Sequence, residues 1–359
     1  MNKTLLAIAA LAATSGAFAQ SSVTLYGVVE ASIENVKGND GVTRVASDNF
    51  LSSRLGFKGS EDLGGGLRAN FNLETNVKTD TGAQGNTARF FDRAAWVGLQ
   101  GGFGELRLGR IDSSIGALAG DTKILGAQAY DDFKIAKTRA GDSYRRLDNA
   151  ITYVLPTFLP GLSAQLQYST AVGTSAATGT ELSGVDAGKA YGLSVKYAAG
   201  PFSAGLGYLS AKDETASIVA SATAVGNVGN KGNATLVYVG YDFGVLKLTG
   251  YYDTESQVTG ADRLSLAGIR VGVPITANFS VQASLAQASN VGFAPSNSDH
   301  DDATIAAIKA VYNLSKRTSV YGLATNVNNE SLSNLNVSGA TTAVGKSSRG
   351  IAFGVAHAF

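Results

Sequence analysis

Few side chains in this sequence could carry catalytic chemistry. The chain has 359 residues, two histidines and no cysteine, which excludes thiolate nucleophiles, disulfides and zinc–thiolate sites. His300 lies in the polar stretch SNSDHDDA and His357 lies two residues before the last residue, so their spacing defines no Ser-His-Asp set. No glycine-rich phosphate loop followed by Lys-Ser/Thr is present. The sequence therefore predicts a protein that is not an enzyme.

One acidic cluster has the right residue types for a divalent cation. It consists of Asp299, His300, Asp301 and Asp302. Calcium loops place their oxygen ligands at regular intervals, and this cluster lacks such spacing. We interpret it as a solvated loop and predict neither a metal site nor a cofactor.

The remaining chemistry open to this chain is electrostatic. Within residues 54–74, alternate positions separate an apolar row from a polar row that includes Arg54, Lys58, Arg68 and Glu74. Fixed charges of this kind select among passing ions when they line a narrow, water-filled passage. The function of these charged side chains therefore depends on which secondary-structure elements carry the polar row and on what that row faces.

The same alternation recurs from residue 23 to the end of the chain. Clear copies are VTLYGVVEASIE, LSAQLQYS, YGLSVKY and FSVQASL. Alternation of apolar and polar residues is typical of β-strands with two different faces. The polar rows also contain Glu30 and Glu105. In the segments 264–273 and 319–326 the pattern does not decide which face is which.

The connections between these segments alternate in length. Short connections are expected at 60–64, 100–103, 156–161, 199–201, 242–244, 274–278 and 313–317. Longer ones rich in Gly, Asn, Asp, Ser and Thr lie between them, for example at 37–49, 78–87, 171–188 and 329–346. Seven tight hairpins and one strand at each end give sixteen strands, with both termini on the short-turn side.

These strands indicate a closed transmembrane barrel. The chain has 16% charged residues and a mean hydropathy of +0.06, and beyond residue 20 it has no run of eighteen apolar residues. Without spanning helices, a chain crosses a bilayer only as a closed barrel. Side chains cannot fill a barrel of about sixteen strands, so its polar rows face water in a lumen. A secreted sandwich or solenoid is the alternative, but its loops would be of similar length at both ends.

The first residues form a separate export segment. Lys3 gives a positive start, residues 5–13 are apolar, and Ala17-Phe18-Ala19 is a small-x-small cleavage site. We therefore predict a cleaved signal peptide at residues 1–19 and a mature single-domain barrel at residues 20–359. The formal net charge of +1 argues against nucleic acid as a partner.

Five stretches together resemble a known family. They are SSVTLYGVVE, SRLGFKGSEDLGGGLRANFNLE, FFDRAAWVGLQGGFGELRLGR, NLSKRTSVYG and GVAHAF. This set is similar to the general porins of the Gram-negative outer membrane, in particular the β-proteobacterial and neisserial group. The resemblance implies a homotrimer of all-β, sixteen-stranded antiparallel barrels in the outer membrane. Each barrel would be a passive channel for small hydrophilic solutes and ions.

The resemblance also implies that the third long loop, residues 111–145, folds inward and narrows the channel. Its length fits this expectation, because connections above about fifteen residues inside a compact fold are usually functional or disordered. A flexible extracellular loop is the alternative for this segment.

Related porins place an arginine cluster on the barrel wall opposite acidic residues of the inward loop. By motif, Arg54, Arg93 and Arg146 match the cluster, and the loop acids that would face it are Asp121, Asp131 or Asp132, among which the motif does not choose. Lys58 and Arg68 add basic charge, and Glu30, Glu74 and Glu105 add acids. We therefore predict that the channel favours small anions, although Arg93 alone could also simply brace the wall.

The last residues carry a second implied role. Ile351, Phe353, Val355, His357 and Phe359 share one face of the final strand. The terminal Phe359 resembles the signal by which the outer-membrane assembly machinery recognises barrels, and we interpret His357 as an interface residue near the periplasmic rim. The expected partners are outer-membrane lipid, sister subunits and this machinery. A substrate-specific channel is the nearest alternative function, followed by a surface adhesin or an outer-membrane enzyme.

Overall fold

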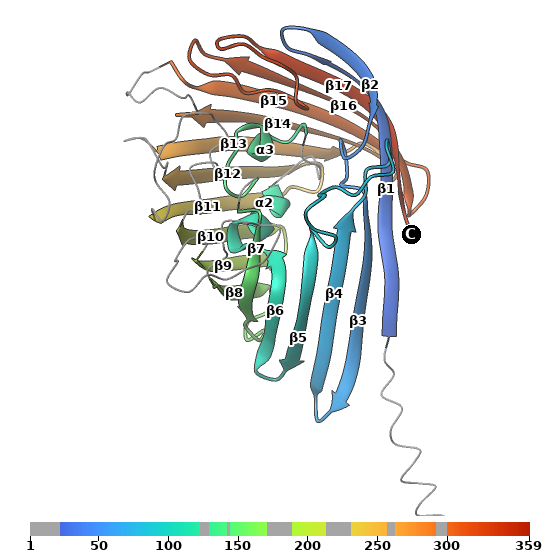
Figure 1. The fold of residues 1–359 in the computed structure, drawn as a ribbon, viewed down its shortest axis with the longest axis vertical. Helices are drawn as coiled ribbons and strands as arrows, with labels where there is room; N and C mark the ends of the chain where they lie inside the picture. Colours follow the sequence, from blue (N-terminus) through green and yellow to red (C-terminus); the bar gives the residue numbers. More distant parts are fainter. Residues whose placement is uncertain are drawn as a thin grey trace, which may run out of the picture.

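The computed structural model describes residues 22–122, 129–141, 144–170, 189–212, 231–256, 263–291 and 300–359. These residues form one antiparallel sheet that curves around on itself (Figure 1). The elements are β1 (Ser22–Lys37), β2 (Gly41–Ala46), β3 (Arg54–Gly64), β4 (Leu67–Asn76), β5 (Ala94–Gly101), β6 (Gly104–Asp112), α2 (Ser114–Thr122), α3 (Asp132–Ile135), β7 (Arg146–Val154), β8 (Leu162–Ser169), β9 (Ala190–Ala199), β10 (Phe202–Lys212), β11 (Lys231–Asp242), β12 (Lys247–Ser256), β13 (Arg263–Pro274), β14 (Phe279–Ser289), β15 (Ala303–Asn313), β16 (Thr318–Asn329) and β17 (Ser348–Ala358). No helix among these residues is long and apolar enough to cross a bilayer. The predicted signal peptide, residues 1–19, lies outside the described residues.

The sheet closes into a barrel because its first and last strands pair. β1 and β17 run antiparallel from Val28↔Ala358 to Lys37↔Arg349. On its other edge, β1 pairs first with β3 and then with β2. Since β2 and β3 share one position in the ring, the seventeen strands of the described residues make a sixteen-stranded barrel. The prediction of about sixteen antiparallel strands is confirmed.

Two predicted connections near the N-terminus differ from the structure. Residues 37–49 were expected to be a loop, but residues 41–46 form β2. Their Val and Thr residues suit a strand, and Arg44 Nε ion-pairs with Glu34 Oε1 of β1 at 2.6 Å. The first short turn is also later than the predicted 60–64, since β3 continues to residue 64 and the turn follows it.

The two faces of the barrel differ as the alternation predicts. The apolar rows point outward, and Val23, Ile33 and Phe353 are 67%, 63% and 67% exposed. In water such rows would be unfavourable, whereas in a bilayer they contact lipid tails. Their neighbours along each strand, such as Ser32 and Ala352, are buried on the inner side.

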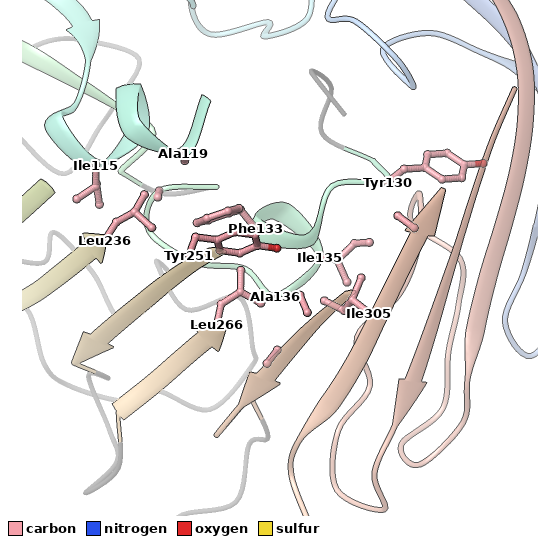
Figure 2. Close-up of a cluster of buried hydrophobic side chains, with 14 of the residues drawn as sticks. Ile115, Ala119, Tyr130, Phe133, Ile135, Ala136, Leu236, Tyr251, Leu266 and Ile305 are labelled. Atoms are coloured by element: carbon pink, nitrogen blue, oxygen red, sulfur yellow. The ribbon is translucent and has the colours of Figure 1, made fainter. Parts of the chain in front are cut away.

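Part of the inner face carries an apolar cluster. Ile115 and Leu118 of α2 and Phe133 of α3 are completely buried. Figure 2 shows Phe133 over Tyr251 of β12, with ring centroids 5.4 Å apart. Leu118 reaches the wall at Gly207 of β10, where a Cβ atom would lie 2.3 Å from its Cδ1. The described parts of this connection, residues 113–122 and 129–141, thus pack on the barrel wall through apolar contacts.

This cluster corrects the expectation that the inner rows are polar throughout. Leu236, Leu266 and Ile305 lie in the cluster (Figure 2) and are at most 1% exposed. In the two segments whose facing the sequence left undecided, the buried row contains Leu266 in β13 and Tyr321 and Leu323 in β16. Apolar residues occupy both faces there because lipid covers one side and loop segments cover the other.

Closure of the barrel depends on Gly27, and we expect Gly27→Val to impair assembly. Gly27 exchanges two backbone hydrogen bonds of 3.1 Å with Phe359. A Cβ atom at residue 27 would lie 2.4 Å from the Phe359 ring and 2.6 Å from the Arg54 carbonyl oxygen. Overpacking of this kind typically costs about 1–3 kcal/mol.

The measurement is the yield of folded barrel after refolding, read from its heat-dependent mobility in gel electrophoresis. The matched control is Gly250→Val in β12, where a Cβ atom meets no other atom within 4 Å. Equal yields for the two variants would show that contact between Gly27 and Phe359 does not limit closure.

Candidate functional site: the arginine-rich wall

Glu74 of β4 brings two of the predicted arginines together. Arg93 Nε lies 2.5 Å from Glu74 Oε1, and Arg54 Nε lies 3.6 Å from Glu74 Oε2. The Tyr26 hydroxyl lies 2.9 Å from the same Oε2 atom. Arg54 begins β3 and Arg93 directly precedes β5, so the two arginines lie at the loop ends of the strands on either side of β4.

A β-bulge adds a second group of charges beside the first. The pairing of β6 with β7 shifts between residues 109 and 111, where Gly109 has φ +132° and Asn149 has φ +47°. Bulges re-aim side chains. Here Arg110 contacts the Asp148 carboxylate, and Arg89 Nη2 lies 2.5 Å from the other oxygen of Asp148.

Arg146, the third predicted arginine, lies at the start of β7. Its Nε atom is 3.0 Å from Asp112 Oδ1, and Arg145 Nη2 is 3.3 Å from Asp112 Oδ2. Arg93 interacts electrostatically with both Arg54 and Arg146 and so connects the groups.

We call this set the arginine-rich wall. It consists of the guanidinium groups of Arg54, Arg89, Arg93, Arg110, Arg145 and Arg146, with the carboxylates of Glu74, Asp92, Asp112 and Asp148. Asp92 belongs to the set because its carbonyl oxygen accepts a hydrogen bond from Arg110 Nε at 2.7 Å. Six positive charges face four negative ones, which leaves a surplus of positive charge. The arginine side chains keep between 10% and 29% of their surface exposed. Their geometry suits Coulombic attraction of anions and offers no nucleophile or general base.

The sequence did not identify Arg89, Arg110 and Arg145 as members of this wall. Strict alternation in β6 would turn Arg110 outward together with Leu106 and Leu108, and only the bulge reverses its direction. The glycine at residue 109 was the available signal, because an isolated glycine in a strand often marks a bulge. Arg89 and Arg145 lie in connections that have no periodic pattern.

The other two basic residues predicted for the pore are not members of the arginine-rich wall. Lys58 Nζ lies 5.2 Å from the centre of the Tyr26 ring, next to the wall. Arg68 is exposed near the β3–β4 turn, about 20 Å along β4 from Glu74 at roughly 3.4 Å per residue.

The predicted acid Glu105 lies near the turn end of β6. It pairs with Arg107 at 2.5 Å, and it accepts a hydrogen bond from Asn70 at 2.9 Å. The Arg107 guanidinium stacks over the Trp96 ring, 4.6 Å from its centre.

The three candidate loop acids lie close to Arg270 of β13. Asp121 of α2 pairs with Lys196 Nζ of β9 at 3.1 Å, and its carbonyl oxygen accepts a hydrogen bond from Arg270 at 3.0 Å. Asp131 is the N-cap of α3, while Asp132 accepts a hydrogen bond from Tyr251. All three interact electrostatically with Arg270.

Glu34 is a buried acceptor shared by several segments. Its carboxylate accepts hydrogen bonds from Tyr130 at 2.8 Å, Asn49 at 2.9 Å and Ser338 at 3.1 Å, in addition to the ion pair with Arg44. Burial, together with the hydrogen bond to Glu34 and its charge, raises the pKa of Tyr130 above its ordinary value, so the phenol keeps its proton.

The predicted pore acid Glu30 belongs to the same buried region. It is 1% exposed and accepts hydrogen bonds from Tyr321 and from the backbone N–H of Asn49. The structure therefore groups Glu30 with the inner packing of β1, whereas Glu74 is part of the arginine-rich wall.

The remaining candidates fall outside the wall. No group of three metal-ligating side chains occurs within the described ranges. Asp299 lies outside those ranges, and the Asp302 carboxylate accepts hydrogen bonds from Ser289 Oγ at 2.9 Å and the Asn290 backbone at 3.1 Å. His357 Nδ1 lies 2.9 Å from Thr318 Oγ1, at the turn end of the barrel.

A closed barrel with an apolar outer face and charged residues on its inner face is the architecture of an outer-membrane channel. Comparison with known proteins agrees, since the model of the Gram-negative porin family matches residues 7–332. The chain belongs to this family. It is a porin channel of the outer membrane and not an enzyme.

Individual relatives support the same assignment. The chain is 32% identical to outer membrane porin protein 32 of Delftia acidovorans over the whole of both chains. It is also 32% identical to the major outer membrane protein P.IB of Neisseria meningitidis serogroup B, over 47% of this chain and 50% of that one. Among solved structures, the anion-selective porin from Comamonas acidovorans has a TM-score of 0.76 and 29% identity, covering 95% of this chain and 100% of that one.

Proposed function

We propose that this porin favours small anions and that the arginine-rich wall sets the preference. The observation that carries the proposal is the surplus of six guanidinium groups over four carboxylates on one stretch of wall. A charged lining between low-dielectric walls concentrates counter-ions in the passage. The similarity to a porin described as anion-selective supports this assignment.

We also propose that residues 111–145 narrow the lumen beside this wall. α2 contacts β8 to β12, and a Cβ atom at Gly120 would lie 3.9 Å from Arg145 Nη2. These contacts support a constriction between the segment and the arginine-rich wall. Ions that pass such a constriction stay within a few ångströms of fixed charge, where screening by salt is weak.

The protein is exported to the outer membrane and assembles there. Residues 1–19 act as a cleaved signal peptide, residues 20–359 form the mature barrel, and three barrels assemble into a homotrimer with outer-membrane lipid around them. Phe359 directs the chain to the barrel assembly machinery, which is consistent with its place at the exposed end of the closing seam.

The test is the reversal potential of the purified channel in a planar bilayer under a tenfold gradient of potassium chloride. A perfectly anion-selective pore gives about 59 mV, with the sign set by chloride. We expect that sign with a smaller magnitude, because four carboxylates share the wall. A zero or cation-type potential contradicts the proposal, and flux that saturates with one solute would indicate a substrate-specific channel.

A further inference from the structure

Two aromatic rings on the inner face of the barrel each contact a cation. The Arg107 guanidinium lies 4.6 Å from the centre of the Trp96 ring, and Lys58 Nζ lies 5.2 Å from the centre of the Tyr26 ring. The strand registers Lys58↔Asn72 and Asn72↔Trp96 place these three residues side by side on β3, β4 and β5. We call the five residues Tyr26, Lys58, Asn72, Trp96 and Arg107 the aromatic–cation platform.

Two glycines give the platform its flat shape. A Cβ atom at Gly56 of β3 would lie 2.4 Å from the Tyr26 ring, and a Cβ atom at Gly98 of β5 would lie 3.1 Å from Arg107 Cγ. The Tyr26 ring and the Arg107 side chain therefore occupy space that a neighbouring side chain would otherwise fill. Glycine in a strand often marks such a close approach.

The platform keeps free groups that an anion could contact. Within the described part of the chain, Lys58 is exposed and has no carboxylate partner. The Asn72 side-chain oxygen accepts the Tyr26 hydroxyl at 2.9 Å, which leaves its NH2 group without a partner among the same residues. Arg107 pairs with Glu105 at 2.5 Å. Two cations and an amide donor thus face one carboxylate.

The platform lies between the arginine-rich wall and the short-turn end of the barrel. Lys58 is four residues along β3 from Arg54, or about 13 Å at roughly 3.4 Å per residue. Glu74, the next acid along β4, contacts Arg54 and Arg93, so its charge is already compensated. An anion that passes the arginine-rich wall toward the periplasm therefore meets the platform on the same side of the lumen.

We propose that the aromatic–cation platform is a weak binding site for aromatic carboxylates. The carboxylate would lie between Lys58 Nζ and the Asn72 NH2 group, and the ring would stack on the Arg107 guanidinium, which itself rests on Trp96. Two strand spacings separate Lys58 from Trp96 by about 10 Å, which suits a molecule the size of benzoate with its contacts on both sides. The inference rests on the proposed anion preference, because that preference brings the solute to the site.

Two features of the platform select this class of solute. A planar guanidinium stacks on aromatic faces, which favours a ring over an aliphatic chain. The cations favour an anion over a neutral aromatic compound of the same size. Acetate and benzyl alcohol each lack one of these two features, so we expect both to bind about tenfold more weakly than benzoate.

The fluorescence of Trp96 measures binding directly, because it is the only tryptophan in the chain. The mature porin in detergent is titrated with benzoate, acetate and benzyl alcohol, with excitation at the red edge of the indole band, where tyrosine does not absorb. We expect a saturable change with benzoate. Equal binding of acetate or of benzyl alcohol would overturn the proposal, since either result would show that one of the two features has no role.

A matched pair of variants tests the position of the site. Lys58→Gln should weaken benzoate binding by about tenfold, the usual effect of losing one charge-assisted contact. Arg68→Gln removes the same charge from the same inner face, near the β3–β4 turn, and should bind benzoate as wild type does. Equal losses in the two variants would indicate general attraction of anions and overturn the proposal, as would wild-type affinity in Lys58→Gln. Heat-dependent gel mobility confirms that each variant is folded.

The reversal potential in potassium chloride, recorded on the same preparations, separates this inference from the proposed function. An anion-type potential without benzoate binding overturns the inference alone. A cation-type potential with benzoate binding intact overturns only the anion preference.

Discussion

The triple variant Arg54→Gln, Arg93→Gln and Arg146→Gln should convert the channel from anion to cation preference. The wild-type arginine-rich wall holds six arginines and four carboxylates. Removing three arginines leaves Glu74, Asp92, Asp112 and Asp148 in excess, so the sign of the fixed charge changes. In a tenfold gradient of potassium chloride the reversal potential should change sign, within the limits of about 59 mV on either side of zero.

The control variant for this experiment removes a comparable number of positive charges from a site away from the lumen. Lys316→Gln with Arg317→Gln changes two exposed residues in the β15–β16 turn, and its reversal potential should stay at the wild-type value. A triple variant that keeps the wild-type sign, while forming folded channels, would show that the arginine-rich wall does not set selectivity.

Glu255→Ala should release the loop segment from the wall and change the conductance. Glu255 of β12 is 4% exposed, and its two carboxylate oxygens accept the backbone N–H of Arg139 at 2.7 and 2.9 Å. Arg139 is 5% exposed and also interacts electrostatically with Glu255. Removing one partner of a buried charge pair costs about 3–5 kcal/mol.

Single-channel recording measures the consequence. We expect a larger mean current with more frequent fluctuations, since residues 129–141 lose an anchor on β12, and we expect a lower melting temperature. Glu330→Ala, which removes an exposed carboxylate from a loop, should change neither. A variant with reduced melting temperature but wild-type current and noise would mean that this anchor supports the barrel without holding the constriction.

The barrel itself was predictable because its physics is repetitive. Each strand must present an apolar row to lipid, so residues such as Val23, Leu166 and Phe353 recur at every second position and are exposed in the structure. The alternation of short and long connections then sets the number of strands. The division of the second position into β2 and β3 was missed, because the intervening residues 47–53 have no periodic signal, and the first short turn was placed a few residues too early.

The candidate site was less predictable. Arg54 and Glu74 followed from alternation, but Arg110 and Asp148 come together through a bulge, which inverts the facing that alternation predicts. The apolar inner residues Leu266 and Val327 make sense only once segments far away in the chain cover them. Such contacts depend on the path of the loops in the tertiary structure. The alternation of apolar and polar residues along a strand does not specify that path.

The central claim is that alternate residues of each strand line an aqueous passage, and cysteine labelling tests it most directly because the chain has no native cysteine. In β14, Gln282 and Ser284 belong to the inner row, while Ala283 and Leu285 are exposed on the outer face. Four single-cysteine variants are recorded while a negatively charged methanethiosulfonate reagent is added. The open current should drop in steps for residues 282 and 284 and stay constant for 283 and 285. The reverse pattern, or an equal response at all four positions, would contradict the account.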